Sequence, residues 1–561
     1  MTKNAKFNSP NVIELEDLKT IYAKENYDLL EEKAKDLIKK YPNVPSLYNI
    51  LGVSQSSKGS YGDAISNFER AIGMNSKFLD AHNNLGIALK NSGEFLRALN
   101  VFQGALKINS NHPLTNFNLG DLYEKFNEID KAIGCFKKSV ELKPDFNLAY
   151  SNYLFFINYS DKYEKNFYYK EAIGYSESIK KFDETLLTPF QYESSPKNLK
   201  IGFVSGDLRK HPIGYFLHET LGYLKSMNLE LIAFSNLEKN REDKLSQTFK
   251  KIFSKWHSVN TTNDLDLINL VRREKINLLV DLSGHSANSR LPIFINKPAP
   301  VQATWIGYLD TTGIKEMDYI IADPFVVDED QENLFVEKIW KMPKIWNCFS
   351  KPDYNIQVET LPALKNKYIT FGSFNHLNKL NDSVIKLWSA LLKKIPKSKL
   401  FLKYKSLNDD YYKDSIKRKF NKNGIEESQL ILEGSSPRED LLKTYNKIDI
   451  SLDPFPYSGG TTNFESVWMG VPILTLKGKK FISRCGESVN HNLGMSDWIA
   501  RDEDNFVSKA SVFCSDLNKL SDLRARLRQK ALNSPLFDSK KFAEDFHEAL
   551  WKMWKIFLNK N

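Results

Sequence analysis

The turn Gly-Gly-Thr-Thr at 459–462 is the stretch of this sequence whose residue types most clearly suggest chemistry. An alternating run at 448–452 precedes it and is typical of a β-strand, and a helical run then begins at Thr462 and is stopped by Gly470 and Pro472. The first turn of such a helix has free N–H groups and a partial positive charge, so a phosphate can bind there. The pattern therefore favours a phosphate site, although a capped helix after a strand also occurs in any α/β domain.

Glu465 lies three residues after Thr462. This is the spacing of a capping box, in which a carboxylate accepts a hydrogen bond from the backbone at the start of the helix. The same carboxylate could equally accept hydrogen bonds from a ribose, and the sequence leaves both interpretations open.

Two further strand ends carry residues suited to catalysis. The predicted strand at 199–204 is followed by Asp207 and His211, and the predicted strand at 368–375 is followed by Lys379. Ligands of open α/β sheets bind at the carboxyl ends of strands, and histidine is the usual general base near neutral pH. We expect His211 to act on a proton and Lys379 to pair with a diphosphate, although each residue type is more often a hydrogen-bonded loop residue or a surface cation.

Alternating strands and helices fill the chain from about residue 199 onward. Such alternation predicts parallel sheets, and here it predicts two Rossmann-like halves. Arg438 and Arg484 are further candidates for binding phosphate in the second half. No Asp-x-Asp stands at a strand end, as a metal-dependent glycosyltransferase would need. The pattern describes a two-lobed nucleotide-sugar enzyme in which a lysine, a helix dipole and backbone N–H groups neutralise the leaving diphosphate.

The N-terminal third contains an internal repeat. Gly52, Gly86 and Gly120 recur at a period of 34, and aromatic and alanine positions recur with them, which is the tetratricopeptide pattern. Such repeats are helix pairs that stack into a solenoid with a concave surface for protein or peptide. Four asparagines fall on the first helices of their repeats and could hold a peptide backbone, or could simply be solvated polar positions: Asn83, Asn84, Asn116 and Asn118.

Composition limits the function classes. The chain has 561 residues and a net charge of +10, but acidic and basic residues are interspersed, so a dedicated nucleic-acid binder is not expected. Four widely separated cysteines indicate neither a disulfide framework nor a metal site, and a reducing compartment is the simplest expectation. Residues 1–17 are polar, and no apolar run has transmembrane length. We therefore expect a cytoplasmic protein without membrane contact.

The predicted domains follow from these patterns. They are a repeat solenoid at 1–155, a helical connector at 156–198, a first Rossmann-like catalytic lobe at 199–345, a second, nucleotide-sugar-binding lobe at 346–515, and C-terminal helices at 516–561.

Eight stretches of the sequence resemble the bacterial relatives of the O-linked N-acetylglucosamine transferase and SPINDLY group, glycosyltransferase family 41. They are IGFVSGDLRKHPIGYF, LLVDLSGHSANSR, PAPVQATWIGY, MDYIIADP, FGSFNHLNKL, SSPRED, LDPFPYSGGTTNFESVWMGVPILTL and SRCGESV. The resemblance runs from the repeats to about Ser515. It implies an α-solenoid followed by an α/β fold of the GT-B type. It also implies inverting, metal-independent transfer of a sugar to Ser or Thr of proteins, with no cofactor besides the nucleotide-sugar donor.

The resemblance implies roles for individual residues. His211 matches the histidine proposed as the base or as the group that orients the acceptor, and Lys379 matches the lysine that binds the diphosphate and stabilises the leaving group. Thr461 and Thr462 match a threonine pair at the phosphates. Glu465 matches an acidic residue at the ribose.

Ser436 and Arg438 match a loop beside the base and ribose. The residues expected to bind the nucleotide sugar are His376, Ser436, Arg438, Gly460, Thr461, Thr462 and Glu465.

Four positions depart from the animal enzyme of this family. His376 stands at the position of a glutamine near the diphosphate, and Gly460 at that of a histidine before the threonine pair. Leu441 stands at the position of a base-stacking histidine, and Leu309 at that of a proline. These departures bear on the choice of nucleotide. We expect UDP-N-acetylglucosamine, and GDP-fucose, which the SPINDLY branch uses, is the alternative.

Two other functions stay open. One is a repeat-based adaptor that has lost its activity, which the presence of Lys379, both threonines and Glu465 disfavours. The other is an asparagine-linked glucosyltransferase of the same family, whose members usually lack such clear repeats. Protein or peptide acceptors that bind the solenoid are the expected partners.

Overall fold

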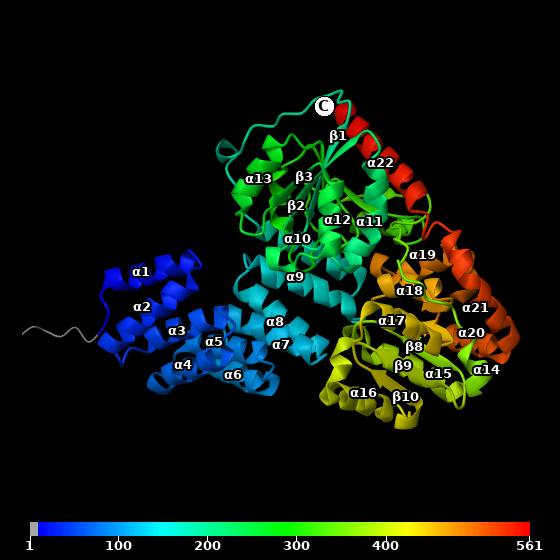
Figure 1. Ribbon diagram of the computed structural model, residues 1–561, viewed down its shortest axis with the longest axis horizontal. Coiled ribbons are helices and arrows are strands. Elements are labelled where there is room, and N and C mark those ends of the chain that lie inside the picture. Colours follow the sequence, from blue (N-terminus) through cyan, green and yellow to red (C-terminus); the bar gives the residue numbers. More distant parts are fainter. Residues whose placement is uncertain (1–8, 561) are drawn as a thin grey trace, which may run out of the picture. The chain divides into compact units, whose positions relative to one another are not determined.

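The computed structural model describes residues 9–560 and divides into two compact units, Met1–Tyr153 and Leu154–Asn561 (Figure 1). Residues 1–8, which belong to the predicted solenoid, lie outside the described residues. No helix among residues 9–560 combines the length and the apolar character that crossing a membrane requires.

The first unit is a stack of helix pairs. Its helices are α1 (Val12–Ala23), α2 (Tyr27–Lys40), α3 (Pro45–Ser57), α4 (Tyr61–Met74), α5 (Leu79–Asn91), α6 (Phe95–Ile108), α7 (Pro113–Lys125) and α8 (Ile129–Leu142). Glycine recurs at a period of 34 because each repeat needs a small residue where its two helices touch. A Cβ on Gly86 would lie 2.5 Å from the ring of Phe102, so only glycine lets α5 and α6 approach this closely.

The asparagines of the repeats mostly bond to the solenoid itself. Asn118 donates to Oδ1 of Asn83 at 2.9 Å, and Asn116 donates to the carbonyl of His112 at 2.9 Å; all three asparagines are buried. Asn84 is partly exposed and donates to Oδ1 of Asn49 at 3.0 Å. Three of the four asparagines predicted to bind a peptide are therefore buried and hydrogen-bonded within the solenoid.

The second unit begins inside α9 (Asn147–Phe156), and α10 (Lys165–Ser178) follows. This connector contacts both sheet domains. Tyr159 stacks on Tyr457 with ring centroids 4.5 Å apart, and Asn158 donates to the hydroxyl of Tyr308 at 3.1 Å.

The first lobe is a seven-stranded parallel sheet with the order β3-β2-β1-β4-β5-β6-β7. Its elements are β1 (Leu199–Ser205), α11 (Pro212–Leu224), β2 (Leu229–Ser235), α12 (Lys244–Ile252), β3 (Lys255–Ser258), α13 (Asp264–Arg273), β4 (Leu278–Asp281), β5 (Val301–Thr304), β6 (Tyr319–Ala322) and β7 (Lys338–Lys341). The strand order reverses between β1 and β4. That reversal is the point at which such sheets bind ligands.

The second lobe is a six-stranded parallel sheet with the order β10-β9-β8-β11-β12-β13. Its elements are α14 (Pro362–Asn366), β8 (Thr370–Ser373), α15 (Asp382–Lys394), β9 (Lys399–Lys403), α16 (Asp410–Lys422), β10 (Leu430–Glu433), α17 (Arg438–Thr444), β11 (Ile450–Leu452), α18 (Thr461–Trp468), β12 (Ile473–Leu476), α19 (Cys485–Asn492), β13 (Ile499–Ala500), α20 (Glu503–Ser515) and α21 (Leu517–Leu532). Here the order reverses between β8 and β11.

The chain passes between the lobes twice. It leaves the first lobe at about residue 346, and α22 (Ser539–Lys560) returns to pack beside α11, where Phe546 stacks on Trp305 at 4.5 Å (Figure 1). The two crossing segments bond to each other, because the backbone N–H of Phe349 donates to the carbonyl of Leu536 at 2.9 Å.

Candidate active site

The candidate site lies at the carboxyl ends of β8 and β11, where the strand order of the second lobe reverses. The chain after β8 carries Asn375 and Lys379, and the chain after β11 carries the turn at 459–462. Because neighbouring parallel strands end at the same edge of a sheet, these two loops meet. Residues that are far apart in the sequence therefore share one site.

Lys379 is buried in this site, with only 9% of the residue exposed. Its Nζ donates to the carbonyl of Ser458 at 2.8 Å and to Oδ1 of Asn375 at 3.1 Å, and it lies 4.4 Å from the centre of the Tyr457 ring. Burial lowers the pKa of Lys379 to about 8, although the Asp453 carboxylate opposes this shift. All partners of the amine other than Asp453 are uncharged, so an anionic ligand would gain a strong interaction with it.

Asn375 joins this lysine to the helix that follows the glycine turn. The hydroxyl of Thr462 donates to Oδ1 of Asn375 at 3.0 Å, and that oxygen also accepts from Lys379. Two donors are thereby held on one oxygen at the beginning of α18.

Asp453 holds the turn at 459–462 in place through hydrogen bonds. Its buried carboxylate accepts from Ser458 Oγ at 2.6 Å, from the Gly459 N–H at 2.6 Å, and from Thr475 Oγ1 at 2.7 Å. A Cβ on Gly486 would lie 2.0 Å from Asp453 Oδ2, so this neighbour must be glycine. Burial raises the pKa of Asp453, and these hydrogen bonds oppose the shift.

The N-terminus of α18 is open. Gly460 is the N-cap residue and no side chain caps the helix, while a Cβ built on Gly460 would meet no atom within 4 Å. The start of α18 is thus left without a side-chain cap, as an anion site there requires. The capping-box interpretation of Glu465 is wrong, because the helix begins at Thr461 and Glu465 lies beyond its first turn.

Glu465 instead pairs with Arg438. The carboxylate is 2% exposed, and its Oε1 lies 2.6 Å from Nη1 of Arg438. Burial raises the pKa of Glu465, and the arginine opposes the shift. The guanidinium also stacks on the ring of Tyr215 at 3.9 Å, so this pair connects the second lobe to α11 of the first.

His211 lies at the start of that same helix, α11. It is the N-cap residue, and its Nδ1 accepts from the Ile213 N–H at 3.4 Å and lies 3.7 Å from Oδ2 of Asp207. Burial lowers the pKa of His211, and Asp207 opposes this shift. The imidazole is therefore neutral at pH 7, which is the form that accepts a proton.

The remaining predicted site residues are His376, Ser436 and Arg484. His376 caps the short turn that carries Lys379, and its ring lies 4.4 Å from that of Tyr404. Ser436 lies between β10 and α17, and its Oγ is buried without a hydrogen-bond partner among residues 9–560. Arg484 is committed to Glu487 at 3.0 Å and to Asp328 of the first lobe at 2.5 Å, so it is not available as a phosphate ligand.

Sequence reasoning assigned no role to two of the central residues, Asn375 and Asp453. Both stand just after strands, at positions where a polar residue interrupts an apolar run, and that signal could have identified them. In the described part of the chain, no three His, Cys, Asp or Glu side chains gather as a metal site would require. Independence from metal stays a prediction.

The lobes match a known family. The model for glycosyl transferase family 41 matches residues 177–351 and 352–546, and that for the tetratricopeptide repeat matches residues 45–78 and 115–146. Both halves of the expected architecture, the repeat solenoid and the two Rossmann-like lobes, are thereby confirmed.

Similar proteins have been described. The sequence is 31% identical over 424 residues to the probable UDP-N-acetylglucosamine–peptide N-acetylglucosaminyltransferase SPINDLY of Solanum lycopersicum, a match that spans 74% of this chain and 45% of that protein. The protein of the same name from Oryza sativa subsp. japonica is 32% identical over 427 residues, with the same shares. The chain thus spans less than half the length of these relatives. A variant of the Thermobaculum terrenum O-GlcNAc transferase superposes with a TM-score of 0.82 at 28% identity, over 92% of this chain and 98% of that one.

Proposed function

This chain belongs to glycosyl transferase family 41, and from that premise we propose that it is an inverting protein O-glycosyltransferase that moves a sugar from a nucleotide donor to Ser or Thr. The observation that carries the proposal is the buried Lys379 beside the open N-terminus of α18. A buried amine with uncharged hydrogen-bond partners, next to an uncapped helix N-terminus, is suited to a diphosphate.

The proposed reaction is a single displacement. The acceptor hydroxyl oxygen forms a bond to the anomeric carbon while the bond from that carbon to the diphosphate oxygen breaks, and the bonding electrons leave with the diphosphate. His211 takes up the hydroxyl proton in its neutral form. Lys379, Thr461 and Thr462 hold the charge that develops on the leaving group. A donor aimed at such a charge typically contributes about a hundred- to a thousandfold in rate.

The nucleotide proposed is UDP, carrying N-acetylglucosamine. The names of the plant relatives and of the Thermobaculum terrenum enzyme support this choice. The ribose is proposed to bind Glu465, which the Arg438 guanidinium covers in the ligand-free chain. His376, Ser436 and Gly460 are proposed to line the remainder of the donor site.

The acceptors proposed are proteins that bind the repeat solenoid. Tetratricopeptide repeats present extended surfaces for protein segments, and this family match supports such a role here. Of the asparagines, Asn84 is the one of the four predicted positions that is partly exposed.

Thermal stabilisation by nucleotides tests the donor. The protein is melted with UDP, UDP-N-acetylglucosamine, GDP or GDP-fucose in EDTA, and Lys379→Met serves as the matched control. Stabilisation by the two uridine ligands that is lost in the variant supports the proposal. Stabilisation by the guanosine ligands alone assigns the chain to the fucose branch, and stabilisation by none supports an inactive adaptor.

A further inference from the structure

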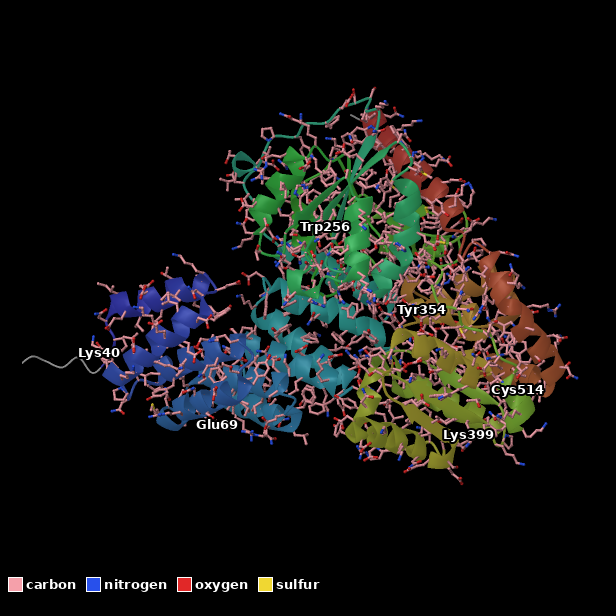
Figure 2. All side chains as sticks on the ribbon, viewed as in Figure 1. Lys40, Glu69, Trp256, Tyr354, Lys399 and Cys514 are labelled. Carbon is pink, nitrogen blue, oxygen red and sulfur yellow. The ribbon has the colours of Figure 1, made fainter. Side chains whose placement is uncertain are left out.

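A basic pocket lies between the lobes beside the candidate site and shares Arg438 with it, but the proposed reaction gives no role to its three lysines. It has a volume of about 380 Å³ and is bounded by α11, α12 and the first crossing segment. Tyr354 lines this pocket. Figure 2 shows Tyr354 where the first and second lobes meet. Its basic lining residues are Lys210, His218, Lys244, Lys351 and Arg438. We call this the basic pocket.

The three lysines of the basic pocket lack acidic partners, whereas its Arg438 pairs with Glu465. The amines of Lys210, Lys244 and Lys351 form no ion pair with any residue between 9 and 560, and the single acidic lining residue is Asp353. Elsewhere on the same lobe, lysines are neutralised: Lys250, on the same helix as Lys244, lies 2.6 Å from Glu242. A concave surface with several unpaired cations favours an anionic ligand.

The proposed nucleotide-sugar donor does not require the positive charge of the basic pocket. Its diphosphate has Lys379 and the N-terminus of α18 in the proposed function, and Arg438 already faces Glu465. The anion that suits the basic pocket therefore comes from the acceptor side.

The distance between His211 and the basic pocket determines which residues of an acceptor peptide can enter the pocket. Lys210 precedes His211 directly, and His218 lies seven residues further along α11, which is about 10 Å at 1.5 Å per residue. An extended peptide advances about 3.3 Å per residue, so roughly three residues cover that distance. A side chain this close to the modified hydroxyl would fall within the basic pocket.

We infer that the basic pocket binds acidic side chains of the acceptor protein that lie within a few residues of the modified Ser or Thr. This inference rests on the proposed function and adds a preference to it. The preferred acceptor carries Asp, Glu or a phosphorylated residue beside its acceptor site, and the ion pairs made in the basic pocket lower KM for that acceptor while kcat is unchanged.

Peptide binding tests the inference without requiring turnover. Two labelled peptides are compared by fluorescence anisotropy at low salt: one carries a single Ser flanked by Glu residues, and the other has Gln in place of each Glu. The wild-type protein is expected to bind the Glu peptide at least about fivefold more tightly, and salt should remove the difference. The double variant Lys244→Glu/Lys351→Glu should lose it.

The matched control is Lys315→Glu/Lys386→Glu, which changes the net charge equally at two exposed lysines outside the pocket. A preference that persists in the pocket variant, or that the control variant loses equally, overturns the inference. A pocket variant with weakened UDP affinity also overturns it, since the pocket would then serve the donor. If the binding preference holds but neither peptide is glycosylated, the basic pocket selects acidic peptides as inferred, and the proposed glycosyl transfer is the part that fails.

Discussion

Lys379 and Thr462 donate to the same atom, Oδ1 of Asn375, at 3.1 and 3.0 Å. Lys379 follows β8 and Thr462 lies in the first turn of α18, so a single amide oxygen joins the two segments of the candidate site. A diphosphate that enters can take over both donors at once, because each already points toward the same small region.

Replacing Lys379 by Met should reduce kcat by at least about a hundredfold. The variant should fold normally. Its melting temperature at pH 7 should be unchanged or raised, since a buried amine whose pKa burial lowers destabilises the fold while it is charged. Steady-state assays and melting curves measure both effects. The site assignment fails if turnover by the variant equals that of the wild type.

Binding of UDP should weaken as pH rises through about 8. The pKa of Lys379 is about 8 in the free protein, and the anion binds the protonated amine, so Kd should increase about tenfold per pH unit above that value. Calorimetric titration between about pH 7 and 9.5 measures the slope. The Lys379→Met variant should bind UDP more weakly, and its Kd should not change with pH. If Kd changes equally with pH in both proteins, a group other than Lys379 is responsible for the pH dependence.

Activity should fall on the acid side as His211 becomes protonated. Burial lowers the pKa of His211 below the ordinary 6.5, so kcat/KM should stay constant as pH decreases to that value and decline only below it. His211→Ala should lose about a hundred- to ten-thousandfold, less than Lys379→Met, and its profile should lack this decline. A wild-type profile without an acid limb that depends on His211 would remove the histidine from the proton transfer.

Two glycine substitutions should have opposite effects on stability. Gly486→Ala places a Cβ 2.0 Å from Asp453 Oδ2 and should destabilise the second unit by about 1–3 kcal/mol. Gly222→Ala lies on the exposed face of α11 with no atom within 4 Å, and it should stabilise by about 0.5–1 kcal/mol. Denaturant unfolding measures both. If Gly486→Ala unfolds with the same free energy as the wild type, the Asp453 side chain can move away from the added Cβ at no cost in stability.

The periodic parts of the fold could be predicted from the sequence. The repeats stand out because Gly86 and Phe102 must touch, and their equivalents recur in each helix pair. The central strands are continuous buried runs, and their predicted bounds lie close to the observed ones, as for the strand predicted at 199–204 and observed at Leu199–Ser205. Edge strands were missed: β3 and β7 are short and partly exposed, so neither carries an apolar run.

Contacts between distant segments could not be predicted. The pairing of Glu465 with Arg438 depends on how α17 and α18 pack, and the local spacing alone suggested a helix cap. Likewise, the association of α22 with the first lobe depends on Trp305 stacking on Phe546, which lie 241 residues apart in sequence.

The paired crossing segments limit how the two lobes move. A single linker would permit both twisting and opening, but two linkers that bond through Phe349 and Leu536 leave one axis, which passes through both. Arg438 stacks on Tyr215 across the two lobes, so opening about that axis has to break this contact together with the ion pair of Arg484 and Asp328.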